Sequence, residues 1–197
     1  MAEAGGVVGR SGEDEDGEEE RGGGAAAAEV QVYCAVGKEA GREWRANLRW
    51  VLANFLRSRH RLVLAHVHRP PHRINMIGAW VPVSQLAEHE VAAYSKLEEE
   101  RASKALDVLI DICASQRVHA RKVVVSGDDA ARGLVQLVDD HGVAELVMGA
   151  AADRGYTRKL RTPKSKKGVT VQRKANPSCR IWFVCKGNLI CTRHVYV

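Results

Sequence analysis

The sequence predicts an α/β fold, in which helices cover both faces of a five-stranded parallel sheet in a three-layer, doubly wound arrangement. First, short apolar runs of strand length alternate with longer amphipathic stretches, which is the pattern of repeated βαβ units. Second, the short runs are apolar at nearly every position, as strands buried on both faces are. Third, 197 residues with 45% hydrophobic and 27% charged content suit one domain with a substantial core.

The first half of the domain is predicted to supply two strands and two helices. A β-branched run over 30–36 predicts the first strand, and apolar residues at helical spacing between 39 and 58 predict an amphipathic helix. A second buried strand follows at 61–67. Residues 68–82 are expected to form a long irregular loop, and the longest helical stretch runs over 83–116.

Two further strands and a helix are predicted between 122 and 149. Residues 122–125, a lysine followed by three valines, predict the third strand. Asp128 or Asp129 is placed to cap a helix over 130–141 through its side-chain oxygen. Residues 145–149 then predict the fourth strand.

The C-terminal part is predicted to hold the fifth strand, over 180–186. Its apolar centre, 181–184, fits either the interior of the sheet or the interface of a homodimer. Before it, residues 169–172 fit either a short helix or an extended piece. After it, a turn at 187–188 leads into 189–192, which indicates a small hairpin.

The chain is expected to divide into three segments. Residues 1–29 are acidic and rich in Gly and Ala, and we predict them to be disordered because they offer little apolar surface to bury. Residues 30–187 form the α/β domain, and 188–197 form a C-terminal extension. No apolar run approaches the roughly 20 residues that a membrane-spanning helix needs, and the N-terminus lacks the pattern of a signal peptide.

The charge is divided unevenly between the tail and the domain. Residues 1–29 hold nine of the 24 acidic residues and two of the 30 basic ones, so the tail carries −7 and the remainder +13. From Arg154 to Val197 there are twelve Lys or Arg and no acid. Such a basic segment attracts phosphates, nucleic acid, an anionic membrane or an acidic peptide, including the tail of this same chain.

The cysteines indicate a reducing environment. Five Cys are present, an odd number, and none forms a CxxC pair. Cys34, Cys113 and Cys185 lie in or beside apolar runs, which is typical of buried thiols. We therefore predict a cytosolic or nuclear location.

The sequence contains no motif that predicts intrinsic catalysis. It lacks a GxxxxGK[ST] loop, a GxSxG elbow, an HExxH pair and the HRD and DFG motifs of kinases. The eight His show no spacing typical of metal ligands. His66, at the end of the second strand, could act as a ligand or base. No partner motif accompanies it, however, so we interpret it as a histidine of the core.

One stretch predicts a ligand site. The apolar run 146–148 leads into the small residues 149–152 and then into the basic segment 154–174. In α/β proteins, ligands bind at the carboxyl ends of parallel strands, where small residues let a phosphate approach the backbone. The alternative is a buried strand followed by a solvated basic loop.

In this order, the pieces resemble the universal stress protein family over residues 30 to about 186. The residues that carry this resemblance are Val32-Tyr33-Cys34-Ala35-Val36-Gly37, Leu64-Ala65-His66-Val67, Gly127-Asp128-Asp129-Ala130 and Ala144-Glu145-Leu146-Val147-Met148-Gly149. More narrowly, three segments look like the N-terminal stress-protein domains of plant U-box protein kinases. These segments are Pro163-Lys164-Ser165-Lys166-Lys167, Asn176-Pro177-Ser178-Cys179 and Ile181-Trp182-Phe183-Val184-Cys185-Lys186-Gly187.

The resemblance implies a Rossmann-like fold of the adenine nucleotide alpha hydrolase type and a site for ATP or AMP with Mg²⁺. The positions that match the family's nucleotide pocket are Ala35, Val36, Gly37, Val67, Met148, Gly149 and Ser165. The basic residues placed to hold phosphate or another anion are Arg154, Arg158, Lys159, Lys164 and Lys166.

The family's phosphate motif, Gly-x2-Gly-x9-Gly followed by Ser or Thr, is degenerate in this sequence. Gly149 fills the first place, but Ala152 and Thr162 stand at the second and third. Gly37 stands where the family usually has an acid. An alanine in place of glycine adds a Cβ that can block a phosphate.

The resemblance leaves two main functions open. One is a non-catalytic, stress-response module that binds nucleotide or signals. The other is a protein-interaction domain from a truncated plant U-box kinase and E3 ubiquitin ligase, no longer binding nucleotide. Its partners would belong to stress or ubiquitin signalling, and the family also implies a homodimer.

A nucleic-acid binder ranks last among the functions considered. Tyr156 is the only aromatic residue in the basic segment, whereas single-strand binders interleave several aromatic residues with their basic ones.

Overall fold

The computed structural model describes residues 30–37, 42–55, 60–150 and 161–194. The predicted acidic tail, 1–29, lies outside the described residues, as do Arg154, Arg158 and Lys159. Within the described part, no helix is both long and apolar enough to cross a membrane.

Strands and helices alternate along the described chain as the sequence predicts. The elements are β1 (Val30–Val36), α1 (Arg42–Phe55), β2 (His60–His68), β3 (Arg73–Met76), β4 (Ala79–Pro82), the short 3-10 helix η1 (Val83–Gln85), α2 (Glu88–Ser115), β5 (Ala120–Ser126), α3 (Ala130–Asp140), β6 (Glu145–Gly149), α4 (Lys166–Lys174), β7 (Arg180–Cys185) and β8 (Asn188–Arg193).

The main sheet has the strand order β5-β2-β1-β6-β7-β8. The first five strands in this order are parallel, which confirms the predicted doubly wound α/β fold. These five parallel strands are the predicted ones, and the predicted hairpin after 187–188 adds a sixth strand, β8, which pairs antiparallel with β7. Lys186 and Gly187 both have positive φ, 50° and 77°, and these two residues turn the chain so tightly that the C-terminal segment returns along β7.

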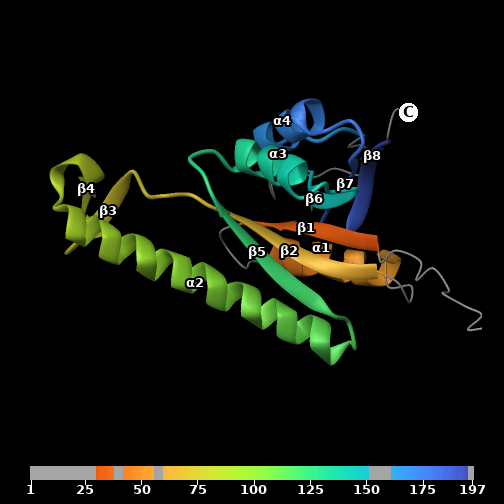
Figure 1. The fold of residues 1–197 in the computed structure, drawn as a ribbon, viewed down its shortest axis with the longest axis horizontal. Coiled ribbons are helices and arrows are strands. Elements are labelled where there is room, and N and C mark those ends of the chain that lie inside the picture. Colours follow the sequence, from red (N-terminus) through yellow and green to blue (C-terminus); the bar gives the residue numbers. More distant parts are fainter. Residues whose placement is uncertain (1–29, 38–41, 56–59, 151–160, 195–197) are drawn as a thin grey trace, which may run out of the picture.

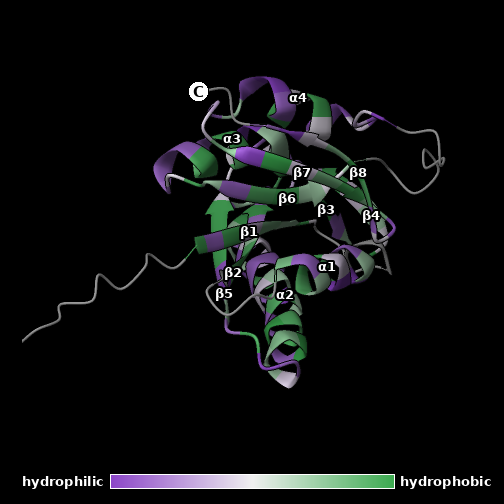
Figure 2. Cartoon of the chain, turned by 90° about the vertical axis from the view of Figure 1, so that its right-hand side faces the viewer, coloured by the Kyte–Doolittle hydropathy of each residue, from purple (hydrophilic) through white to green (hydrophobic). Residues whose placement is uncertain are grey.

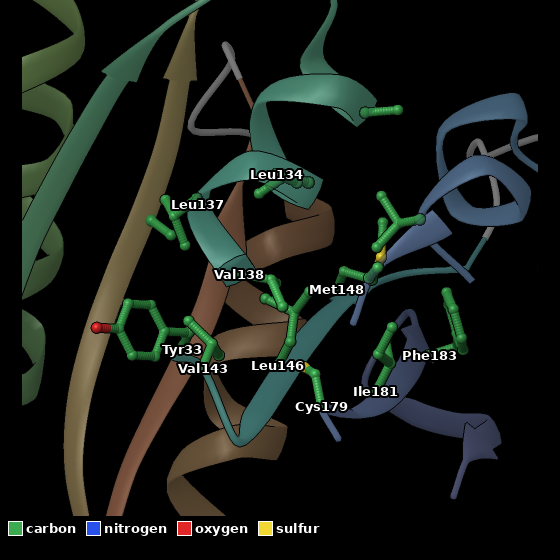
Figure 3. Packing of buried hydrophobic residues seen from close by; sticks show 14 of the residues in the cluster. Tyr33, Leu134, Leu137, Val138, Val143, Leu146, Met148, Cys179, Ile181 and Phe183 are labelled. Atoms are coloured by element: carbon green, nitrogen blue, oxygen red, sulfur yellow. The ribbon is translucent and has the colours of Figure 1, made fainter. Parts of the chain in front are cut away.

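Helices cover both faces of this sheet. Figure 1 shows α3 and α4 on one side, and α1 and α2 on the other. Under α3 and α4, one apolar cluster joins the helices to β6 and β7, and Figure 3 shows Val138 against Leu146 and Met148. A second cluster, which includes Leu48 and Leu109, fills the space under α1 and α2. Figure 2 shows the hydrophobic central strands between helices of mixed hydropathy.

Strand β7 lies in the interior of the sheet. Ile181 and Phe183 are fully buried, and β6 and β8 pair with its two edges. Of the two interpretations left open for residues 181–184, the structure therefore supports the core strand. Residues 169–172, also left open, are helical within α4.

The cysteines are free thiols, and four of the five are buried. Burial raises the pKa of Cys34 to about 12 and the pKa values of Cys113 and Cys179 to about 11. The three thiols are therefore protonated near neutral pH and behave as small apolar side chains.

The predicted irregular loop after β2 contains an antiparallel hairpin, β3–β4, which is separate from the main sheet. Figure 1 shows it beside the N-terminal end of α2, beyond the body of the sheet. Ile77 and Gly78, with φ of 50° and 86°, form its two-residue turn, which the irregular-loop interpretation missed because Ile is rare in such turns. Ile74 is buried, whereas Ile77 is fully exposed and Trp80 is 58% exposed.

Replacing Ile77 with Asn is expected to stabilise the protein by about 1 kcal/mol, because a β-branched residue is strained at positive φ and Asn tolerates it. Chemical denaturation measures the free energy of unfolding. Ile77→Val is the matched control, since it keeps the β-branch and should bring no gain. Equal stability of Ile77→Asn and the parent would contradict the strain argument.

Strand β8 also holds the C-terminal end of α4. The guanidinium of Arg193 donates hydrogen bonds of 2.5 to 3.0 Å to four backbone carbonyls, those of Gln172, Ala175, Asn176 and Cys179. The last carbonyls of a helix lack partners within the helix. A side chain from the sixth strand thus satisfies the end of α4 and the loop that leads to β7.

Arg193→Met is expected to destabilise the protein by about 2 to 4 kcal/mol, because it leaves several half-buried carbonyls without a donor. The unfolding midpoint in urea measures the loss. Arg173→Met, at an exposed position in the last turn of α4, should change stability by less than about 0.5 kcal/mol. A similar effect of both changes would show that the carbonyl contacts contribute little.

Candidate functional site

The order of the strands places a switch point between β1 and β6. From β1 the chain continues to β2 and β5 on one side, and then returns to β6 and β7 on the other. In open α/β sheets, ligands bind outside the carboxyl ends of the strands at such a reversal. The carboxyl ends of β1, β2 and β6, with the segments that follow them, are called the carboxyl edge below.

The structure brings most of the predicted pocket residues to this edge. Ala35 and Val36 end β1, Gly37 follows it, and Met148 and Gly149 end the neighbouring strand β6. A Cβ built on Gly37 would meet no atom of the described residues within 4 Å, and among the same residues one on Gly149 would meet only Asn47 Nδ2, at 3.9 Å. The described part of the chain therefore leaves space beside both glycines.

Two of the predicted residues direct their side chains into the core instead. Val67 packs under α3, where a Cβ on Gly133 would lie only 2.6 Å from Val67 Cγ1. Met148 is 2% exposed and belongs to the same apolar cluster. At these positions only the backbone can meet a ligand at the edge.

Helix α4 begins at the end of β6. The amides of Lys164 and Ser165 both donate to the carbonyl of Ala150, at 2.7 and 3.2 Å. Ser165 is the N-cap of α4, and its Oγ accepts a hydrogen bond of 3.0 Å from the amide of Gly168. The predicted Ser165 thus stands at the positive end of a helix, where amides without intrahelical partners favour anions.

Gly168 permits this close start of the helix. A Cβ at this position would lie 2.9 Å from both Pro163 Cβ and Ser165 Oγ, and 3.7 Å from the carbonyl oxygen of Gly149. A larger residue would push the first turn of α4 away from Pro163. The family's glycine motif does not predict this position, because Gly168 follows the serine.

Two cations from distant segments add positive charge at the edge. Lys167, in the first turn of α4, has its pKa lowered by burial and by the charge of Arg69, which follows β2. The negative charge of Asp129 raises the pKa of Lys167 instead. Its carboxylate already accepts hydrogen bonds from the amides of Ala131 and Arg132, both at 2.9 Å.

His66 forms a buried wall of the same edge. It is 4% exposed, and its Nδ1 lies 3.0 Å from the carbonyl oxygen of Val36. Burial lowers the pKa of His66, the hydrogen bond to Val36 raises it, and the nearby charges of His68, Lys167 and Arg69 lower it further. The imidazole is therefore neutral near pH 7 and faces a positive environment.

The basic residues predicted to bind an anion divide into two groups. Lys164 and Lys166 flank Ser165 at the start of α4, and both are exposed. Arg154, Arg158 and Lys159 lie outside the described residues. Sequence reasoning missed Arg69 as a site residue, and the signal that could have found it is its place directly after β2, before Pro70.

A cleft of about 370 Å³ adjoins the edge on the side of α2. It lies between the end of β2, the segment that follows β2, and the middle of α2. Its lining residues are His66, Val67, His68, Arg69, Pro70, Pro71, His72, Glu98, Arg101, Ala102 and Asp128. Among the described residues, no three His, Cys, Asp or Glu are grouped so that they could hold a metal ion.

Asp129→Ala is expected to destabilise the protein by about 1 kcal/mol at pH 7, because the N-cap of α3 is lost. Hydrogen bonds from the amides of Arg132 and Ala131 hold the pKa of Asp129 below its usual 3.8. The carboxylate therefore contributes fully above its unfolded-state pKa, and this contribution is lost as the pH falls through the folded-state pKa.

The stability difference between Asp129→Ala and the parent should accordingly shrink as the pH falls below about 4. Urea denaturation at several pH values measures it. Asp128→Ala, at the exposed neighbouring position, is the matched control. A difference that stays constant down to pH 2.5 would contradict a role for the ionised carboxylate.

The sequence is related to plant U-box proteins, although no protein-family model matches the chain. It is 38% identical over 163 residues to U-box domain-containing protein 33 of Arabidopsis thaliana, covering 83% of this chain and 19% of that protein. U-box domain-containing protein 36 is 34% identical, with 83% and 34% covered, and protein 54 is 34% identical, with 82% and 50% covered. The chain thus spans between a fifth and a half of these relatives.

One solved structure in particular shows the fold. A universal stress protein family protein from Burkholderia pseudomallei matches with a TM-score of 0.51 at 14% identity, covering 80% of this chain and 97% of that one. A universal stress protein family protein from Arabidopsis thaliana with AMP bound has a TM-score of 0.48 at 13% identity, with 78% and 90% covered. The predicted resemblance is confirmed: this chain has the universal stress protein fold and is related to plant U-box domain-containing proteins.

Proposed function

We propose that this universal stress protein-like domain is a non-catalytic nucleotide-binding module of the stress response, which holds ATP or AMP at its carboxyl edge. The observation that carries the proposal is the N-terminus of α4, which begins directly beyond the end of β6 with Ser165 as its N-cap. The positive charges of Lys167, in the first turn of this helix, and of Arg69, whose charge acts on Lys167, favour an anion at this point.

The phosphate is proposed to lie at the first turn of α4. The amides of Lys166 and Lys167 are free of intrahelical partners by their position, and the hydroxyl of Ser165 can still donate a hydrogen bond. Lys167 and Arg69 supply charge-assisted contacts. The N-cap Ser165 would then replace the glycine–serine corner that the degenerate motif lacks around Thr162.

The remaining part of the nucleotide is proposed to lie across the ends of β1 and β6. The described residues leave space beside Gly37 and Gly149 for it. Mg²⁺ would bridge the phosphates of ATP, and it would arrive with the nucleotide, since the described residues form no metal-binding group of their own. A phosphate beside Lys167 would offset the charge of Arg69 and favour the protonated amine.

Calorimetric titration of the full chain with AMP, ADP and ATP, with and without Mg²⁺ at near-physiological salt, tests the proposal. We expect micromolar binding that weakens at least about tenfold in Lys167→Met, because a charge-assisted contact to phosphate is lost. Gly149→Val should weaken binding as well, since its side chain would fill the open space. Lys174→Met, at the far end of α4, is the control and should bind as the parent does.

The absence of binding at millimolar ATP would overturn the proposal. So would equal affinities of Lys167→Met and Lys174→Met, because the edge would then contribute nothing specific. Circular dichroism on each variant shows whether a loss of binding comes from unfolding.

The second candidate is a protein-interaction domain in ubiquitin signalling. Two observations favour it: the relation to U-box proteins, and the exposed Ile77 and Trp80 on the hairpin. Exposed large apolar side chains on a projecting element are typical of protein contacts. A chain that binds no nucleotide and loses a stress or ubiquitin-pathway partner on Trp80→Ser would support this candidate.

Two further expectations stay predictions. A homodimer through the last strand would form at β8, because β7 is covered on both edges. Leu189 of β8 is 43% exposed and would lie at that interface. A cytosolic or nuclear location likewise stays a prediction from the cysteine pattern.

A further inference from the structure

The amino ends of β1, β2 and β5 form one corner of the sheet, at the edge opposite the carboxyl edge. Gln31 of β1 pairs with Arg61 of β2 in this corner. Further along β2, Val63 pairs with Tyr33 of β1 and with Arg121 of β5. Tyr33 and Val63 pack in the cluster under α3, and alternate residues of a strand share a face. Gln31, Arg61 and Arg121 therefore lie on the α3 side of the sheet, and we call this surface the amino corner.

The guanidinium of Arg121 is held at the amino corner by neutral groups. Its Nη2 donates hydrogen bonds to Gln31 Oε1, at 2.9 Å, and to the hydroxyl of Tyr33, at 3.2 Å. Its Cζ lies 6.0 Å from the centre of the Tyr33 ring, and Figure 3 shows the hydroxyl of Tyr33 directed away from the apolar cluster. Because an amide and a phenol carry no charge, these contacts position the exposed guanidinium and leave its positive charge available to an anion.

Two further arginines add positive charge beside Arg121. Arg61 lies on the neighbouring strand, and Arg117 is exposed in the turn between α2 and β5, with a φ of 59°. The amide of Leu62 donates a hydrogen bond of 3.2 Å to the carbonyl of His119, which holds this turn against the start of β2. Three arginines from separate segments thus share one corner.

The acids of the described residues leave this charge unbalanced. Helix α3 ends beside the corner with Asp139 and Asp140, both exposed. In the described part of the chain, however, neither Arg117 nor Arg121 has a carboxylate within ion-pair distance. The corner therefore favours an acidic partner.

The sequence holds a complementary segment shortly before this corner. Residues 13–20 contain seven of the nine acids of the tail, with Gly17 as the only other residue. Residue 20 lies ten residues before Val30, which begins β1. Ten residues of chain reach at most about 35 Å, enough to bring the segment to the corner. A tethered segment also has an effective concentration of about millimolar, which offsets the weakness of single exposed ion pairs.

We propose that the amino corner binds the acidic segment 13–20 of the same chain, whose carboxylates pair with the guanidinium groups of Arg117, Arg121 and Arg61. Arginine presents parallel N–H donors that match a carboxylate. A separate acidic protein then has to displace the tail before it reaches this surface. The corner lies at the opposite edge of the sheet from the proposed nucleotide site, so the inference stands whether or not nucleotide binds.

Two-dimensional NMR of the full chain tests the proposal against a neutral-tail variant, in which each Glu of 13–20 is replaced with Gln and each Asp with Asn. We expect the neutral tail to shift the backbone amide signals of Gln31, His119 and Arg121, because the carboxylates no longer lie at the corner. The shift differences between the two chains should disappear as NaCl is raised from about 50 to 500 mM, since salt screens exposed ion pairs.

A synthetic peptide of residues 12–20 measures the affinity of the corner. It should bind the neutral-tail chain saturably, and the parent at least about tenfold more weakly, because the parent's own tail occupies the surface. In the neutral-tail chain, Arg117→Gln combined with Arg121→Gln should weaken peptide binding at least about fivefold. Arg173→Gln combined with Lys174→Gln removes two exposed charges from the end of α4, and this matched control should leave the affinity unchanged.

A neutral tail that shifts no signal at the corner would overturn the proposal. So would equal peptide affinities of the two double variants, or shifts concentrated on α4, which would place the tail there. Shift differences that grow with protein concentration would place the tail on a second copy instead. If the double variant at the corner does not fold, Arg117→Gln alone, at an exposed position, replaces it and should weaken the peptide about twofold.

Discussion

The hydrogen bonds that Lys164 and Ser165 donate to the carbonyl of Ala150 decide where helix α4 begins. They hold the first turn of the helix directly beyond the end of β6, and Gly168 lets that turn close on Pro163. The positive end of a helix therefore lies at the point where the strand order reverses. The position of Lys167, whose charge acts together with that of Arg69 on His66, depends on this one junction.

The sixth strand stabilises the same helix from its other end. Arg193 of β8 binds four carbonyls around the C-terminus of α4 and the loop that precedes β7. Both ends of α4 are thus fixed by polar contacts with neighbouring strands or loops. A short helix of nine residues has little stability of its own, so these contacts matter for its position.

The two faces of β2 have different roles, one apolar and one polar. One face buries Val67 against Gly133 of α3 and contributes to the core that supports the edge. The other face directs His66 and His68 toward α2, where the apolar core ends and a polar cleft begins. Because neighbouring residues of a strand point to opposite sides, one short segment, His66-Val67-His68, contributes both to the core and to a polar wall.

The sequence alone determined the order and type of most elements. Apolar runs such as 30–36 and 145–149 predicted buried parallel strands, and Asp129 marked the start of α3, because local periodicity and capping act over a few residues. It also placed Gly37, Gly149 and Ser165 at one edge, since the carboxyl ends of parallel strands share an edge. Only the tertiary structure decided that the charge of Arg69 acts on Lys167, that Arg193 binds the carbonyls at the end of α4, and that Ile77 turns a hairpin. Those contacts join residues from separate segments or require an unusual backbone conformation, and neither leaves a periodic pattern in the sequence.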